Sequence, residues 1–165
     1  MSRFDELNNN IMTVLLKIID NKNLCKLVNY NSYDPLSEAD MEDSSSLLFD
    51  KIYPYPFTPD VDSIASTQIN VMFDNFQLGK DNPAFKNNQL TFVVICHSKL
   101  WRMNGMLRPF AIMKEIDSLF NSVNGLGVGK MKFVSSNIMW VNANYSGYRI
   151  SYSLCDFNWG CCTYE

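Results

Sequence analysis

The sequence predicts a single α+β domain in which an N-terminal helix and one main helix pack on a mostly antiparallel sheet. Residues 89–97 are too short and too β-branched for a helix, and they predict a largely buried strand. Residues 107–123 carry apolar side chains at helical spacing, and residues 131–141 and 145–155 predict an antiparallel hairpin. With a further strand before residue 89, the order after the first helix is ββαββ.

Composition and charge limit the classes of function. The 165 residues suit one domain, 1–165, with a proper core, and the net charge is −3. That charge argues against broad nucleic-acid binding, which requires a basic face. The longest apolar run, residues 92–96, has the length of a strand and not of a membrane span. Five cysteines without framework spacing indicate a reduced, cytosolic folding environment.

Residues 4–20 predict the first helix, which is interrupted at residues 21–23 and continues as a short piece over residues 24–28. Its apolar side chains form one broad stripe: Leu7, Ile11, Val14, Leu15, Ile18 and Ile19. The opposite face is polar but not basic, so we expect a helix that packs on the core and does not lie on a membrane surface.

Residues 33–60 predict a long loop followed by a proline-aromatic extended arm. The acidic loop lacks the glycine that a calcium-binding loop requires, which disfavours a metal site there. Pro54, Pro56 and Pro59 exclude a central strand, so we expect the arm to lie along an edge or over the surface of the sheet. The arm is either a connector that covers the core or a stiff segment that docks on a neighbouring subunit.

The strand that precedes the buried one spans residues 68–77 and alternates apolar and polar side chains. The alternation breaks after Phe73, which predicts a bulge near Asp74-Asn75. A polar loop over residues 79–88 then returns the chain to the buried strand, so the two strands should pair as an antiparallel hairpin.

The main helix has Pro109 in its first turn, where a missing N–H has no cost. We expect Asn124-Gly125 to end it, with Gly125 in the left-handed conformation. The residues at helical spacing are Phe110, Met113, Ile116, Phe120 and Val123. In the last strand one face carries Tyr148, Ile150, Tyr152 and Leu154. Residues 158–165 form an irregular tail.

A nucleophile with a neighbouring base is not indicated. His97 is the only histidine and directly follows Cys96, but neighbouring residues of a strand point to opposite faces. The spacing gives no support for pairing His97 with Cys155 or Cys162. A structural or partner-facing histidine is therefore the better interpretation.

Metal and nucleotide signatures are equally absent from the sequence. A zinc site would use cysteines that lack the usual Cys-x-x-Cys spacing: Cys96, Cys155, Cys161 and Cys162. The Gly-x-Gly-x-Gly string over residues 125–129 follows a helix and precedes a strand, which is the reverse of a phosphate-binding loop. We predict no catalytic, cofactor-binding or metal-binding residue, and a protein that is not an enzyme.

Several local strings are distinctive. They are Asp34-Pro-Leu-Ser-Glu38, Ile52-Tyr-Pro-Tyr-Pro56, Asn82-Pro-Ala-Phe-Lys86, Leu90-Thr-Phe-Val-Val-Ile-Cys-His97, Leu100-Trp101, Leu107-Arg-Pro109, Glu115-Ile-Asp117 and Gly127-Val-Gly-Lys130. With these strings the chain resembles the small neck and tail-completion proteins of tailed bacteriophages, in particular the tail terminator-like family. The resemblance covers roughly residues 24–157.

The resemblance implies a structural virion protein of the tail or neck, assembled in the host cytoplasm. Terminator-class proteins form a ring, usually hexameric, that caps the tail tube and joins it to the neck. The implied partners are copies of itself, the tail tube protein and neck, stopper or connector proteins, with DNA only in non-specific passage and no membrane. The alternatives are a head–tail connector or stopper-type adaptor and a soluble non-catalytic binding protein. A metallo-hydrolase is disfavoured.

Aromatic and arginine residues outside the core pattern are the usual anchors of an interface. They occur here in the arm, in the connector over residues 97–105 and at the tip of the first hairpin. The candidates for subunit or partner contacts are Tyr53, Tyr55, Phe57, Asn82, Phe85, Trp101 and Arg102. Each could equally pack within its own chain.

Overall fold

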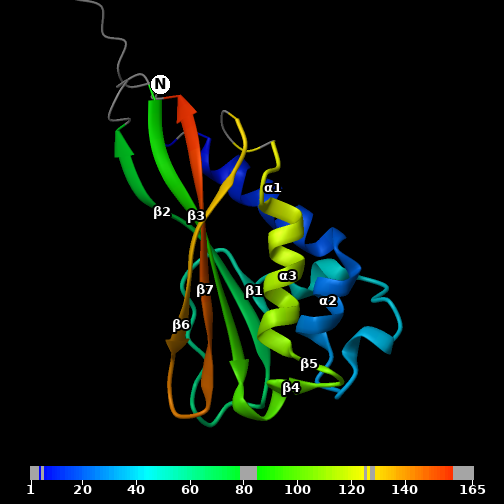
Figure 1. Ribbon diagram of the computed structural model, residues 1–165. Coiled ribbons are helices and arrows are strands. Elements are labelled where there is room, and N and C mark those ends of the chain that lie inside the picture. Colours follow the sequence, from blue (N-terminus) through cyan, green and yellow to red (C-terminus); the bar gives the residue numbers. More distant parts are fainter. Residues whose placement is uncertain (1–3, 5, 79–84, 125, 127–128, 158–165) are drawn as a thin grey trace, which may run out of the picture.

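The computed structural model describes residues 4, 6–78, 85–124, 126 and 129–157, and it confirms the α+β fold with an N-terminal helix (Figure 1). The helices are α1 (Leu7–Asp20), α2 (Lys22–Asn29) and α3 (Arg108–Phe120). The main strands are β1 (Ile52–Tyr53), β2 (Thr67–Leu78), β3 (Phe85–His97), β6 (Lys132–Trp140) and β7 (Tyr145–Phe157). A small hairpin of β4 (Arg102–Met103) and β5 (Met106–Leu107) precedes α3.

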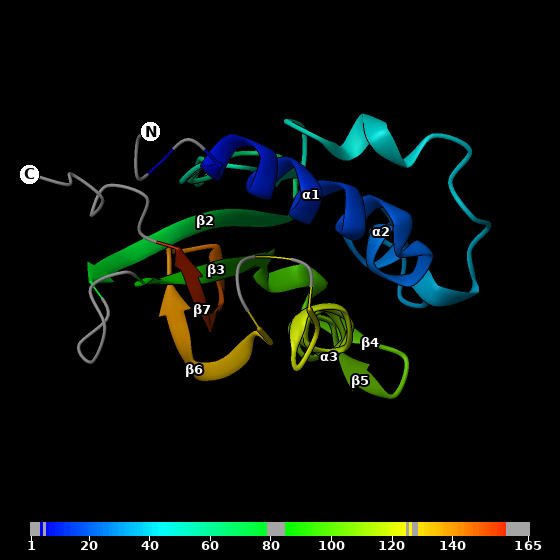
Figure 2. The same cartoon turned by 90° about the horizontal axis from the view of Figure 1, so that it is seen from above.

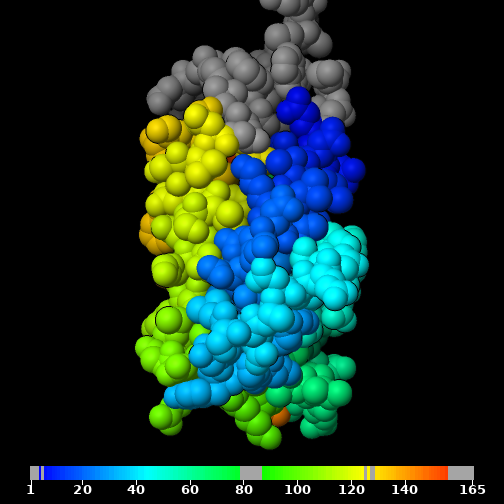
Figure 3. Space-filling model, turned by 90° about the vertical axis from the view of Figure 1, so that its right-hand side faces the viewer, coloured from blue at the N-terminus to red at the C-terminus, as the bar shows by residue number. Residues whose placement is uncertain are grey.

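The main sheet has the order β1-β2-β3-β7-β6, and only the short β1–β2 pair is parallel. The helices cover one face of this sheet, α1 on the β2 side and α3 on the β6 side (Figure 2). Seen from that side, the helices and the segment around residues 30–50 form the visible surface (Figure 3). The two edges of the sheet therefore lie on opposite sides of the molecule.

Strand β3 is the centre of the core and is buried on both faces, as the sequence predicted. Toward the helices it presents Leu90, Phe92, Val94 and Cys96, each with no exposed surface. The ring of Phe92 lies 4.8 Å from that of Phe120 and 6.1 Å from that of Tyr152. On the opposite face a second small cluster joins Val93, Ile95 and Tyr145. This strand thus packs against side chains from α3 and β7 at once.

The predicted hairpin of β2 and β3 is confirmed, including its irregularity. The register shifts between Asp74 and Gln77, and Asn75 has a φ of 54°. Asparagine tolerates this left-handed conformation better than most residues, because its short polar side chain can bond locally. The bulge leaves Asp74 able to accept from the Thr91 hydroxyl at 3.1 Å, and it also pairs with Arg149.

The first helix begins at Leu7 and not at the predicted Phe4, and it ends at Asp20 as predicted. Asn21 then separates α1 from α2. Its side-chain oxygen accepts from the Leu24 N–H at 2.9 Å, while its amide nitrogen donates to Glu115 of α3 at 3.1 Å. One asparagine therefore caps α2 and ties it to α3.

The prediction for the end of the main helix was wrong. Helix α3 ends at Phe120, before the predicted Asn124-Gly125, and Ser122 takes the left-handed conformation, with a φ of 59°. The Ser122 N–H donates to the carbonyl of Met131, the residue before β6, at 2.9 Å, so this pairing stops the helix early. Gly125 itself lies outside the described residues.

The buried stripe of α3 also differs from the spacing pattern. Ala111, Ile112, Ile116 and Phe120 face the core, whereas Phe110 is 47% exposed. Positions 112, 116 and 120 follow one another at intervals of four residues and form one side of the helix. Phe110 is displaced from that side and contacts Tyr148 near the sheet edge, with ring centroids 5.4 Å apart.

Arg108 fixes the orientation of α3. Its guanidinium is fully buried and donates to four backbone carbonyl oxygens: Leu27 (2.6 Å), Tyr30 (2.7 Å), Ser32 (2.9 Å) and Leu100 (2.9 Å). The first two acceptors lie at the carboxyl end of α2, where the helix dipole favours a positive charge. In these four contacts the positive charge of Arg108 is stabilised by the dipoles of backbone carbonyl groups.

We expect Arg108→Met to lower the free energy of unfolding by about 3 kcal/mol or more, because a buried acceptor that loses its donor costs about 1–3 kcal/mol. Urea unfolding followed by circular dichroism measures the change. Arg102→Met makes the same substitution at an exposed arginine of the same chain and should cost under about 0.5 kcal/mol. Equal losses in the two variants would contradict the role of Arg108.

Gly147 of β7 lies directly against the backbone of β3. A Cβ at this position would overlap the Val94 carbonyl oxygen and would lie 2.8 Å from its carbon and 3.2 Å from the Ile95 Cα. These are backbone atoms of the central strand, so they cannot turn aside as a side chain could.

Gly147→Ala should therefore destabilise the fold by about 3 kcal/mol, the upper part of the range for overpacking. Thermal and urea unfolding test this. Gly105→Ala is the control, since no atom lies within 4 Å of its Cβ and only its φ of 73° resists alanine, at about 1–2 kcal/mol. A Gly147 variant no less stable than the Gly105 variant would refute the close-approach argument.

Candidate functional site

The structure separates the residues that a nucleophilic mechanism would need. His97 Nδ1 accepts from the Lys99 N–H at 3.2 Å, and its ring packs edge-on against Tyr145 at 4.9 Å. Cys96 is fully buried, and burial raises the pKa of its thiol to about 12. His97 pairs with Tyr145, whereas Cys155 pairs with Asn87, ten residues away along β3 and thus about 30 Å away. Cys162 lies outside the described residues.

The acidic segment is tied to α2 by ion pairs. Asp40 contacts the Lys22 ammonium at 2.7 Å and the Lys26 ammonium at 2.8 Å. Asp43 accepts from the Ser45 N–H at 3.0 Å and so begins the short 3-10 turn Ser44–Leu47. Over the described ranges, no three His, Cys, Asp or Glu side chains converge as metal ligands. These carboxylates hold a loop in place.

The proline-aromatic arm starts at the sheet edge, as expected, and then folds over its own sheet. Ile52 and Tyr53 form β1 beside β2. The Phe57 carbonyl accepts from the amides of Gln68 (2.9 Å) and Asn70 (2.7 Å), on the face opposite the helices. The segment then crosses to the β6–β7 turn, where Asn142 donates to the Pro59 carbonyl at 2.9 Å. The arm covers the part of this face between Gln68 and the β6–β7 turn.

The three aromatic residues proposed from the arm differ in exposure. Tyr53 is 8% exposed and stacks on Phe57 with ring centroids 4.3 Å apart. Tyr55 and Phe57 remain 43% and 39% exposed, and Phe49 beside Tyr55 is 59% exposed. Phe49, Tyr55 and Phe57 form what we call the arm surface. It lies at the β1–β2 edge of the sheet.

An apolar hollow of about 510 Å³ adjoins the arm surface. Tyr55 lines it together with Leu7 and Ile11 from α1 and with Met72 and Phe73 from β2. The first turn of α1, the arm and the outer part of β2 meet here. The hollow is open at the edge of the sheet, where a side chain from another molecule could enter.

The remaining predicted interface residues lie elsewhere. Trp101 is half-buried, and its indole N–H donates to the Cys96 carbonyl at 3.3 Å, so it serves the fold of its own chain. Arg102 is exposed on β4. Asn82 lies outside the described residues, and so does the side chain of Phe85. The structure therefore does not bring the seven candidates together in one place.

Sequence reasoning missed a second apolar surface at the opposite sheet edge. Strand β6 exposes Phe133 (51%), Ile138 (45%) and Trp140 (77%). Phe110 of α3 lies near this strand, because its ring contacts Tyr148, which pairs with Ile138. We call these four residues the β6 surface. In the part of the chain that the structure describes, no strand pairs with the outer edge of β6. The available signal was the run of residues 133–140, which contains no charge and no proline.

A groove of about 460 Å³ runs between α3 and β6. Met113 and Phe133 line it, and Ser136 contributes a buried hydroxyl without a hydrogen-bond partner in the structure. At its base the Tyr152 hydroxyl donates to Asp117 at 2.9 Å, and burial raises the pKa of that hydroxyl above its usual value. The groove extends the β6 surface.

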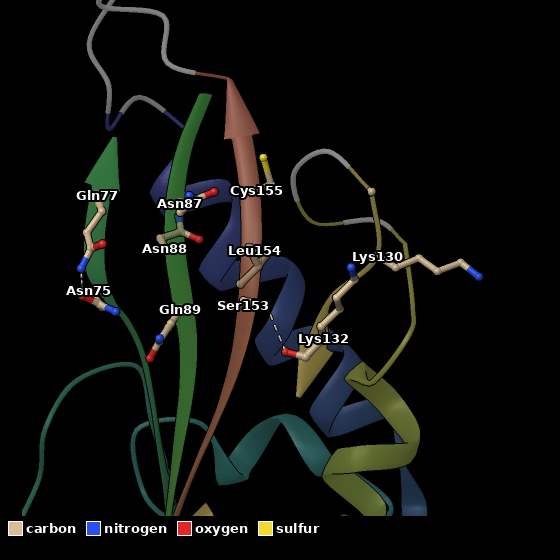
Figure 4. Close-up of a pocket in the computed structure, with 11 residues that line it drawn as sticks. Asn75, Gln77, Asn87, Asn88, Gln89, Lys130, Lys132, Ser153, Leu154 and Cys155 are labelled. Carbon is tan, nitrogen blue, oxygen red and sulfur yellow. Dashed lines mark hydrogen bonds between the residues drawn. The ribbon is translucent and has the colours of Figure 1, made fainter. Parts of the chain in front are cut away.

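A polar hollow of about 520 Å³ lies at the end of the sheet where β3 begins and β7 ends (Figure 4). Amide side chains dominate its lining: Asn75, Gln77, Asn87, Asn88 and Gln89. Gln77 donates to Asn75 at 2.8 Å, and Lys130 extends away from the hollow. The amides offer hydrogen-bond donors and acceptors, and Lys132 and Cys155 add titratable groups to the lining.

Comparison with known proteins assigns most of the chain to a family. The model of the family YomW matches residues 21–154, which is most of the chain. No curated protein and no solved structure matches the chain. Among the described residues, no helix is both long and apolar enough to cross a membrane.

The Asp40 ion pairs generate a pH-dependent prediction. The hydrogen bond from Lys22, with that from Lys26, lowers the pKa of Asp40 to about 2. Because this lies below the unfolded value of about 3.9, the pairs stabilise the fold above pH 4 and this contribution is lost toward pH 2. The stability of Asp40→Asn should therefore fall less than that of the parent between pH 4 and 2, as urea unfolding measures. An Asp40 carboxyl that titrates near 4 in an NMR experiment would contradict this.

Proposed function

The chain belongs to the YomW family, which derives from Bacillus phages of the SPbeta-like prophage type, and we propose that it is a structural virion protein of a tailed phage. We propose further that it forms a ring at the head–tail junction, with six copies as the expected number. This ring terminates or completes the tail and joins it to the neck. In this proposal the protein is not an enzyme and carries no cofactor.

One observation carries the proposal beyond the family. The chain presents two different apolar surfaces, the arm surface and the β6 surface, at opposite edges of one sheet. Contiguous apolar patches that stay exposed mark interaction sites in soluble proteins. A subunit with two different contact surfaces on opposite sides assembles head to tail, and it closes into a ring when the rotation per subunit allows.

The rest of the molecule suits a rigid subunit. The helices pack on one face of the sheet, and the arm is hydrogen-bonded to residues on the other. These contacts should keep the two edges at a fixed distance and angle. The net charge of −3 would give a DNA passage a lining with little affinity for phosphate. The proposed partners are other copies of the chain, the tail tube protein below and the neck or stopper protein above.

The test uses the purified chain and the tail tubes of the same phage. Native mass spectrometry should give a closed oligomer at micromolar concentration, and electron microscopy should show it at one end of each tube. Tubes of an unrelated phage serve as the control. A monomer that neither assembles nor joins its own tail tubes would refute the proposal. A ring that binds the portal or stopper protein but no tube would instead assign the connector or stopper role.

A further inference from the structure

We infer that the contact between neighbouring copies joins the β6 surface of one subunit to the arm surface and apolar hollow of the next. The inference rests on the proposed ring and names its interface. The occupant of each surface is thus a second copy of this chain. The argument uses the open edge of β6, the hollow at the other edge, and the strand directions and charges that connect them.

Beyond Lys132 and the irregularity at Phe133–Ser135, the outer edge of β6 carries little protection against pairing. Edge strands are normally shielded by charge, proline or a covering segment. Residues 133–140 contain neither a charge nor a proline, and Trp140 is 77% exposed. The three large aromatics of the β6 surface leave on the order of 300 Å² in water, since each aromatic side chain carries about 150–250 Å². This is a substantial part of the roughly 800 Å² that one partner buries in a stable interface.

The opposite edge provides the matching shape. Strand β1 pairs only with Ile69 and Asn70, so among the described residues no strand covers the outer edge of β2 beyond them. The hollow of about 510 Å³ opens there, beside Phe73. One edge therefore presents projecting apolar side chains and the other an apolar depression.

Strand direction and register allow the sheet to continue from copy to copy. Adjacent strands from β2 to β6 are antiparallel, so β6 of one copy would run antiparallel to β2 of the next. Phe133 lies in the same row as Tyr152, Leu90 and Phe73. A level continuation of the sheet therefore brings Phe133 of one copy to the hollow beside Phe73 of its neighbour.

Charge placement agrees with this register. Lys132 lies in one row with Ser153, Gln89 and Asp74, so a lysine stands at one edge and an aspartate at the other. A level contact would place Lys132 beside Asp74, whose carboxylate also pairs with Arg149 of its own chain. A two-fold contact of β6 with β6 would instead leave the arm surface and hollow uncovered. The head-to-tail contact covers both surfaces.

The test mixes two blocked variants. Phe133→Lys blocks the β6 surface, and Tyr55→Lys blocks the hollow; neither variant alone should form the oligomer of the parent. Mixed in equal amounts they should form a one-to-one dimer, because each still has one intact surface, and native mass spectrometry with one isotope-labelled partner detects it. Leu16→Lys is the matched control: Leu16 is 52% exposed, close to the 51% of Phe133, and this variant should assemble normally.

Trp140→Lys repeats the block on β6 at a more exposed residue, in case Phe133→Lys fails to fold. If the parent forms a ring and both β6 variants, folded by circular dichroism, also form it, the interface is wrong while the ring survives. If Tyr55→Lys forms a dimer by itself, the contact is a two-fold β6 pair and the inference is overturned. If the folded parent remains a monomer even with tail tubes present, both the ring and its interface are refuted.

Discussion

The buried guanidinium of Arg108 is the constraint on which the helical layer depends. It lies at the start of α3 and holds the carboxyl end of α2, the chain that follows it and the turn before β4 through four carbonyl oxygens. A lysine could not make these bonds together, because the planar fork of arginine directs its donors to several acceptors at once. The position and rotation of α3 on the sheet follow from this anchor.

That rotation has consequences for the surface. With Ile112, Ile116 and Phe120 against the sheet, Phe110 must face outward, next to Tyr148 and the β6 edge. On the other side of the molecule, the arm is bound to its own sheet through Gln68, Asn70 and Asn142. Part of each face of the sheet is thereby covered within the chain. Both edges of the sheet keep large apolar side chains exposed, as do other places such as Leu16 of α1 and Ile64.

Pattern reasoning succeeded where a residue's role depends on near neighbours in the chain. The β-branched run of β3 and the broken alternation near Asp74 predicted a buried strand and a bulge, and both are present. It failed at the end of α3, where pairing between Ser122 and Met131 stops the helix before Gly125. It also read Phe110 as part of a helical stripe, because spacing does not show which side of a helix the sheet will cover.

Sequence alone determined the fold class, the order of the main strands and helices, the extended course of the arm at a sheet edge and the absence of catalytic or metal-binding motifs. These follow from local periodicity, proline chemistry and motif spacing. Only the tertiary structure decided that β7 lies between β3 and β6, which leaves β6 at an open edge. It also decided that Tyr53 is buried while Phe133 and Trp140 are exposed. Strand order and edge position depend on contacts between distant segments, and no local pattern records them.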